Sequence, residues 1–238
     1  MRALLVLAAR AILAQASPDD TTDWKSLGMS AASSGNLEGA AKYLGNACEI
    51  APKDEDTCYF FARALYTLTR YSEARPAFEI ARRSARKKKR ERVERAVALN
   101  FAALDQPEEA ERHFREAVRA QLASDRSGED SRIDYGAFLT RQGRTSEAAA
   151  LLERAVRDEP NSPRANAELG RALLHLGRTE QAVRRLEMSV QLDPKVPATR
   201  LSLGKAYLEL GRAVDGEREL RLAQEDWSRH YYGSSTVK

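Results

Sequence analysis

Few residues in this 238-residue sequence have the types and spacing that catalysis or metal binding requires. The three histidines, His113, His175 and His230, lie far apart, and none is followed four residues later by another zinc ligand. The two cysteines, Cys48 and Cys58, are too few and too widely spaced for a metal set. The sequence also lacks a G-x-x-x-x-G-K phosphate loop and a G-x-S-x-G elbow. We therefore expect no enzymatic activity and no cofactor or metal.

One stretch is dense enough in positive charge to bind an anionic partner. Between Arg82 and Arg95 the sequence has nine basic and two acidic residues, whereas the net charge of the whole chain is only +4. The centre of this basic run is Arg86, Lys87, Lys88, Lys89 and Arg90. Such a run can bind an acidic protein, an acidic lipid surface or nucleic acid, or it can be a solvated stretch of helix. No aromatic residue is interleaved for base stacking, so we place nucleic acid last and favour the solvated stretch.

The first sixteen residues have the composition of a targeting segment. A basic start, Met1-Arg2, precedes an apolar run, and an Ala-Gln-Ala sequence at 14–16 precedes a turn-like Ser-Pro-Asp-Asp. These parts predict a cleaved signal peptide over residues 1–16 and an exported, periplasmic protein. Arg10 interrupts the apolar run, so the alternative is an amphipathic first segment of a cytoplasmic protein. No later stretch is apolar enough to predict a transmembrane helix.

The elements that position these residues are indicated by a period of 34 positions. The following residues return at this distance: Leu169-Gly170 as Leu203-Gly204, Gly177-Arg178 as Gly211-Arg212, Leu186 as Leu220, and Pro163 as Pro197. Alanine, leucine, arginine and glutamate dominate the composition, which favours helix nearly everywhere. A period of this length predicts an array of helical hairpins.

The repeated small residues have a physical role in such hairpins. We expect glycines on each first helix where a second helix crosses it closely, at Gly28, Gly136, Gly170 and Gly204. Alanines should face them from the second helices, at Ala40, Ala74, Ala110, Ala148 and Ala182. A second set of glycines should end the first helices in a left-handed conformation, at Gly35, Gly143, Gly177 and Gly211.

The best single repeat has Trp24, Leu27-Gly28, Ala40, Leu44, Ala47 and Pro52, in the order W-x2-L-G, A, a large apolar residue, A and P. This pattern resembles the tetratricopeptide repeat family. The resemblance implies an all-α fold, a right-handed α-solenoid of about six helix-turn-helix hairpins over residues 17–232, followed by a flexible tail over 233–238. The repeats are expected at about 21–54, 55–88, 91–124, 129–162, 163–196 and 197–230.

The repeat register also places several other residues. It brings Cys48, near the end of one second helix, close to Cys58, at the start of the next first helix. This leaves two alternatives, a disulfide if the chain is exported or two buried thiols, and we favour the thiols. The basic run falls where the second helix of repeat two would run on into repeat three. His113 is expected at the surface, and Trp227 with its neighbouring tyrosines is expected to cover the last apolar face.

In this family the concave groove, lined by the first helices, usually binds an extended or helical peptide. Transferring the register places the following residues on that inner face: Lys25, Met29, Tyr59, Arg63, Tyr66, Arg95, Leu99, Ile133, Arg141, Arg164, Arg171, His175, Leu201 and Lys205. This mixture of aromatic, apolar and basic side chains suits an acidic peptide with apolar anchors, or a terminal carboxylate.

Some members of the family hold a chaperone's terminal carboxylate with a clamp of Lys, Asn, Asn, Lys and Arg. Lys25 matches the first lysine of that clamp, but Met29 and Phe60 stand where the two asparagines would be. A role as a cytosolic chaperone adaptor is therefore not expected.

The sequence thus predicts a non-catalytic scaffold or adaptor that binds a peptide or another protein in the groove. Two alternatives stay open. The array could be the regulatory or targeting subunit of an enzyme complex, such as a glycosyltransferase, or it could be an adaptor for acidic partners or membranes through residues 82–95.

Overall fold

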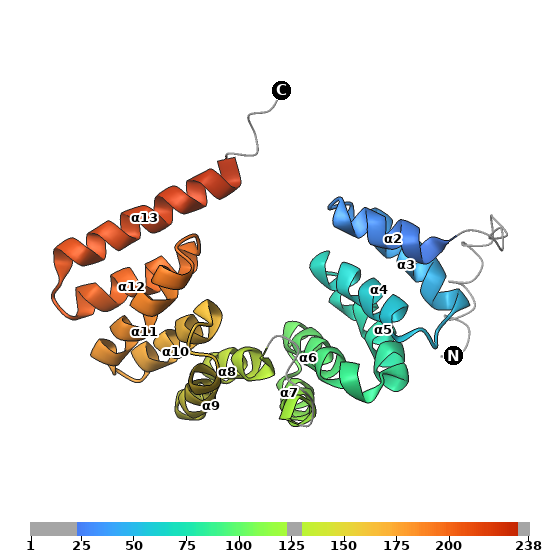
Figure 1. Cartoon of the computed structure of the whole chain (residues 1–238), viewed down its shortest axis with the longest axis horizontal. Coiled ribbons are helices and arrows are strands. Elements are labelled where there is room, and N and C mark those ends of the chain that lie inside the picture. The colour runs from blue at the N-terminus through green and yellow to red at the C-terminus, as the bar shows by residue number, and fades with distance from the viewer. Residues whose placement is uncertain (1–22, 123–129, 233–238) are drawn as a thin grey trace. The chain divides into compact units, whose positions relative to one another are not determined.

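The computed structural model describes residues 23–122 and 130–232, so the predicted signal peptide and the predicted tail lie outside the described residues. Within these two ranges the chain forms twelve helices and no strand (Figure 1). The prediction of an all-α solenoid is confirmed. The helices belong to two compact units, one ending at Ser84 and the other beginning at Ala85.

The described residues of the first unit form two helical hairpins. Its described helices are α2 (Trp24–Ser33), α3 (Leu37–Ile50), α4 (Glu55–Thr67) and α5 (Tyr71–Ser84). Helix α2 packs on α3 and α4 on α5, and α3 also packs on α4, which joins the two hairpins. Each hairpin is therefore held by its own pair of helices and by the next hairpin, as in repeat arrays.

The second unit continues with four hairpins. Its described helices are α6 (Lys87–Ala103), α7 (Pro107–Leu122), α8 (Ser131–Arg141), α9 (Thr145–Asp158), α10 (Pro163–His175), α11 (Thr179–Leu192), α12 (Pro197–Glu209) and α13 (Ala213–Tyr232). Within this unit each helix packs on the helix that follows it, from α6 to α13. The first helices α6, α8, α10 and α12 also contact one another in succession and form one layer of the unit.

The crossings of first and second helices depend on the glycines that the sequence singled out. A Cβ atom added to Gly28 or Gly136 would lie 2.5 Å from the Cγ of a leucine on the second helix, Leu44 or Leu152. The alanines that face these crossings are fully buried, among them Ala40 and Ala148. The small residues let the two backbones approach closely, so the predicted reason for the 34-residue period is confirmed.

The turns inside the hairpins use left-handed residues. Gly35, Gly143, Gly177 and Gly211 all have φ between +70° and +79°. Repeats two and three lack this glycine, and Thr69 (φ 59°) and Asp105 (φ 55°) take the left-handed conformation there. The backbone turn is therefore kept even where the residue that tolerates it best is missing.

Short polar side chains begin several helices. Five residues accept a hydrogen bond from a backbone N–H in the first turn: Asp23, Asn36, Asp54, Asp130 and Ser162. Proline at the first position starts α10 and α12, because it needs no backbone donor there.

One local prediction is wrong. The second helix of repeat two does not continue through the basic run: α5 ends at Ser84 and α6 begins at Lys87, because Arg86 is extended with φ −73° and ψ 160°. Trp227 is 44% exposed on α13, and its covering of the last apolar face stays a prediction.

Candidate functional site

A pocket of about 320 Å³ lies on the first-helix side of the first unit. Two residues predicted for the inner face, Met29 on α2 and Arg63 on α4, line it together. The remaining lining is mostly apolar: Ala32, Ser33, Leu37, Leu44, Phe60, Ala64 and Thr67. This pocket has the size of a small ligand site and could hold one large side chain of a peptide.

Arg63 supplies the positive charge of this pocket. Its guanidinium carbon lies 5.9 Å from the centre of the Tyr59 ring. The side chain is exposed, and no carboxylate of the described residues forms an ion pair with it. The cation is therefore oriented by an aromatic face and keeps its hydrogen-bond donors for an anion.

Two hydroxyl groups at the pocket are already used as donors. Ser33 Oγ donates to the carbonyl of Met29 at 2.9 Å, and Thr67 Oγ1 donates to the carbonyl of Arg63 at 3.0 Å. Their oxygens can still accept a hydrogen bond, because a hydroxyl has two lone pairs. These two oxygens could thus accept a hydrogen bond from a backbone N–H of a bound peptide.

Two residues predicted for the inner face are not at a surface. Tyr59 is only 3% exposed and packs edge-on against Phe78, and Ile133 is 4% exposed. Their assignment to the groove is wrong, because both side chains point into the packed core. Tyr66 is half-buried and lies against Tyr71, with 5.1 Å between the ring centres.

Lys25 is engaged within the first unit. Its Nζ lies 2.6 Å from Oδ2 of Asp54, the residue that caps α4. Burial raises the pKa of Asp54, but hydrogen bonds from Lys25, Thr57 and the N–H of Asp56 outweigh it and lower this pKa to about 2. The lysine that matches the family's carboxylate clamp therefore already has a carboxylate partner.

Three arginines predicted for the inner face are also paired, in the second unit. Arg95 Nη1 lies 3.0 Å from Oδ2 of Asp134, and Arg164 pairs with the other oxygen of the same carboxylate. Arg171 pairs with Glu168 one turn away on α10. The two pairs with Asp134 connect α8 to α6 and to α10, and all three pairs neutralise part of the predicted basic surface.

The other predicted residues of the second unit differ in exposure. Arg141, His175 and Lys205 are exposed on α8, α10 and α12, and the described residues give them no ion-pair partner. Leu99 and Leu201 are half-buried. These exposed basic side chains and half-buried leucines keep the residue types that the sequence predicted for the groove.

A buried polar pair was not foreseen. His113 is 5% exposed, so the expectation of a surface position is wrong. Its Nδ1 lies 2.7 Å from Oε2 of the buried Glu94, and its ring stacks on Phe101 with 5.3 Å between centres. Arg90 pairs with the same Glu94. The pair satisfies buried polar groups within the α6–α7 hairpin, since the aromatic ring and the helices enclose it.

The basic run is partly neutralised by neighbouring acids. Arg82 pairs with Glu79, while Arg90 and Arg95 pair with acids on α6 itself. Lys87 and Lys88 are exposed and have no ion-pair partner among the described residues. The compact block of charge seen in the sequence is thus divided between paired arginines and a few solvated lysines.

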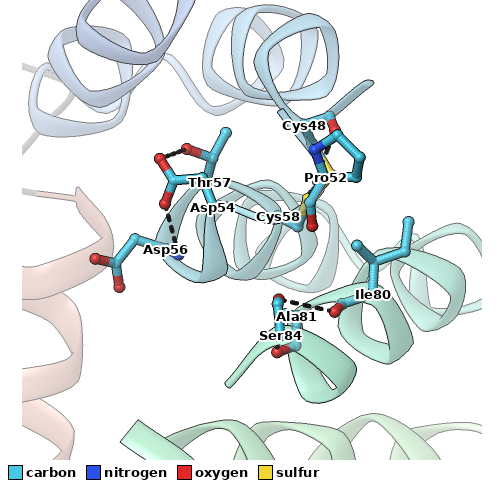
Figure 2. Close-up of a disulfide and its surroundings, with 9 residues drawn as sticks. All are labelled: Cys48, Pro52, Asp54, Asp56, Thr57, Cys58, Ile80, Ala81 and Ser84. Carbon is cyan, nitrogen blue, oxygen red and sulfur yellow. Dashed lines mark hydrogen bonds between the residues drawn. A yellow bond between two sulfur atoms is a disulfide. The ribbon is translucent and has the colours of Figure 1, made fainter. Parts of the chain in front are cut away.

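Cys48 and Cys58 form a disulfide between the end of α3 and the first turn of α4 (Figure 2). The disulfide alternative is therefore the correct one, and the expectation of two buried thiols is wrong. Both cysteines are buried, at 4% and 0% exposure. Asp54 and Thr57 lie on the same turn, so the disulfide and the cap of α4 reinforce one junction.

Two further properties concern the described residues only. None of their helices combines the length and apolar character that crossing a bilayer requires. They also contain no group of three His, Cys, Asp or Glu side chains arranged as metal ligands.

Comparison with known proteins identifies the repeat. The tetratricopeptide repeat family model matches residues 139–189. No protein of curated function matches the sequence significantly.

Three solved structures share the fold at 18% identity. PilW, described as a widely conserved type IV pilus biogenesis factor, has a TM-score of 0.71 over 91% of this chain and 96% of that one. YrrB, described as a tetratricopeptide protein with an unusual peptide-binding site, has a TM-score of 0.54 over 83% and 100%. The human IFIT1 dimer with PPP-AAAA has a TM-score of 0.63 over 79% of this chain but only 46% of IFIT1, so the chain spans less than half of that protein.

The 34-residue period, the glycine-dependent helix crossings and these matches all point to one family. The chain has the fold of tetratricopeptide repeat proteins, and its residues 139–189 match the model of that family.

Proposed function

We propose that the chain is a non-catalytic scaffold that binds a peptide segment of a partner protein in the pocket between α2 and α4. The peptide carries an acidic residue next to a large apolar side chain. The observation that carries this proposal is Arg63, an exposed cation without a carboxylate partner among the described residues, above an apolar floor.

The chemistry of the pocket supports this choice of ligand. The carboxylate of the peptide would pair with Arg63, and its apolar side chain would fill the space between Met29 and Phe60. A charge-assisted hydrogen bond gives orientation, and apolar burial gives affinity. Repeat arrays commonly present such surfaces to peptides, and YrrB is described as having a peptide-binding site.

Selection from a random peptide library displayed on phage tests the proposal. The full chain should enrich peptides with an Asp or Glu beside Leu, Phe or Met. Their affinity should fall about tenfold in the Arg63→Gln variant, the cost of one charge-assisted hydrogen bond. The matched control is Arg75→Gln, which removes an exposed, unpaired arginine from α5 and should leave affinity unchanged. Equal affinity in the wild type and the Arg63→Gln variant would contradict the proposal.

We also propose that the protein is exported to the cell envelope. Disulfides persist in oxidising compartments, and Cys48–Cys58 is such a bond. PilW, a structural neighbour, is described as a pilus biogenesis factor. Mass spectrometry of the protein from its native cell should find a mature chain that begins after Ala16 and carries no free thiol. An intact first segment together with two free thiols would contradict export.

A further inference from the structure

A second pocket lies between two second helices, whereas the α2–α4 pocket lies between two first helices. It has a volume of about 560 Å³ and is formed by α9, α10 and α11 of the second unit. The first helices of this unit pack on one another in succession, whereas the second helices α9 and α11 have little direct contact with each other. The space between these two second helices is the pocket, and α10 forms its floor.

The walls of this pocket are positively charged. Arg157 stands on α9, and Arg184 and Arg185 stand on α11. Glu153 is the single acidic residue of the lining. All three arginines are exposed, and none forms an ion pair with a carboxylate of the described residues.

Several arginines elsewhere in the same unit are paired. Arg144 binds two glutamates, Arg132 binds two aspartates, and Arg200 binds Glu219 and Asp226. The chain also leaves Arg154, Arg178 and Arg221 unpaired among the described residues, but these three lie outside the pocket. Around this pocket it leaves three guanidinium groups available to a ligand.

The floor of the pocket is apolar. Leu169 and Leu173 of α10 lie there, and both are almost fully buried beneath the opening. They offer no hydrogen-bond donor to an anion at the base of the pocket. A small inorganic anion would find its donors only on the rim, whereas an apolar side chain would lie over the two leucines and contact the exposed Pro160 of the same lining.

From this arrangement we propose a second ligand site, which binds an acidic peptide segment lying between α9 and α11. One leucine-like side chain of the peptide rests on Leu169 and Leu173, and carboxylates on either side of it reach Arg157 on one wall and Arg184 and Arg185 on the other. The site is separate from the α2–α4 pocket, since it belongs to the other unit and to the other set of helices. The protein can therefore hold two peptide segments at once.

Fluorescence anisotropy with a defined peptide tests this site. The probe is a fluorescein-labelled peptide of sequence Asp-Glu-Leu-Asp-Glu, titrated in about 0.15 M salt with the full chain carrying Arg63→Gln. That background removes the cation of the first pocket, so the two proposals are tested apart. The pocket variant adds Arg157→Gln, Arg184→Gln and Arg185→Gln. The matched control adds Arg154→Gln, Arg178→Gln and Arg221→Gln, three exposed and unpaired arginines of the same unit outside the pocket.

The pocket variant should bind the peptide at least tenfold more weakly than the Arg63→Gln background, because each exposed ion pair contributes a factor of about two to three. The control should change affinity less than twofold, and replacing the peptide's leucine by serine should weaken binding to the background. Circular dichroism should show that both variants keep their helices. The proposal is overturned if the background does not bind the peptide, if both triple variants weaken binding equally, or if inorganic phosphate displaces it.

Discussion

Gly170 has no side chain because Leu186 occupies the place where its Cβ would lie. The distance from that Cβ position to the leucine Cγ is only 2.6 Å. The same arrangement recurs at Gly204, whose Cβ would lie 2.8 Å from Cγ of Leu220, one repeat later. A single missing methyl group thus sets how closely two helices approach, and repeating it makes the crossings at Gly28, Gly136, Gly170 and Gly204 alike.

Replacing Gly170 by alanine should therefore destabilise the second unit. We expect the free energy of unfolding to fall by about 1–3 kcal/mol, the usual effect of overpacking a filled core. Urea denaturation followed by circular dichroism measures it. The control is Gly177→Asn: its φ is +70°, no other atom lies within 4 Å of the added Cβ, and asparagine tolerates this conformation. A larger loss of unfolding free energy in Gly177→Asn than in Gly170→Ala would contradict this explanation of the helix crossings.

At the scale of the elements, the start of α4 joins three hairpin helices. Asp54 caps α4 through the N–H of Asp56 and also binds Lys25 of α2. The disulfide ties the first turn of α4 to the end of α3. One short junction therefore combines an ion pair, a helix cap and a covalent bond, each of which can be removed separately.

The charge of Asp54 should stabilise the protein over a defined pH range. Its pKa is about 2 in the folded state, below the 3.8 of a free side chain, so its contribution is present above about pH 4 and is lost as the pH falls towards 2. Asp54→Asn keeps a capping side chain but removes the charge. It should cost about 1 kcal/mol at pH 7, a value reduced for solvent screening of this partly exposed group.

Thermal or urea unfolding of wild type and Asp54→Asn between pH 2 and pH 7 tests this prediction. The stability difference should shrink steadily below pH 4. A difference that stays constant over this range would show that the charge of Asp54 does not stabilise the junction.

Removing the disulfide should weaken the first unit. The bond closes a loop with a sequence separation of 10, for which chain entropy predicts about 2–3 kcal/mol. The double variant Cys48→Ala, Cys58→Ala should lose this amount of unfolding free energy under oxidising conditions. Wild type in excess reductant should match the double variant within error. Wild type whose stability does not respond to reductant would contradict the prediction.

For the whole molecule, the sequence predicted the features that depend on backbone packing. Glycine and alanine at the crossings and left-handed glycines in the turns recur because every hairpin meets the same steric requirement. The twelve described helices, α2 to α13, alternate as first and second helices, as that period requires. These features can be recognised in the sequence because each depends on a contact with a residue at a fixed separation along the chain.

The surface could be predicted only in part. Met29 and Arg63 do meet in one pocket, as the register suggested. The pairing of Arg95 and Arg164 with Asp134 spans 39 and 30 positions and depends on side-chain conformations that a periodic pattern does not contain. Tyr59 is buried against Phe78 of its own hairpin, and Ile133 is buried on α8, which the residue types alone did not indicate. The pocket between α9 and α11 depends on how far second helices stand apart, which the sequence pattern does not report.

The most direct test of the account is hydrogen–deuterium exchange of the full chain with and without a saturating amount of the peptide selected on phage. We predict slower exchange in α2, Trp24–Ser33, and α4, Glu55–Thr67, because the bound peptide covers the pocket between them. The Arg63→Gln variant should lose this protection, and the Arg75→Gln variant should keep it. Unchanged exchange in both helices at saturating peptide would contradict the proposal that this protein acts through the α2–α4 pocket.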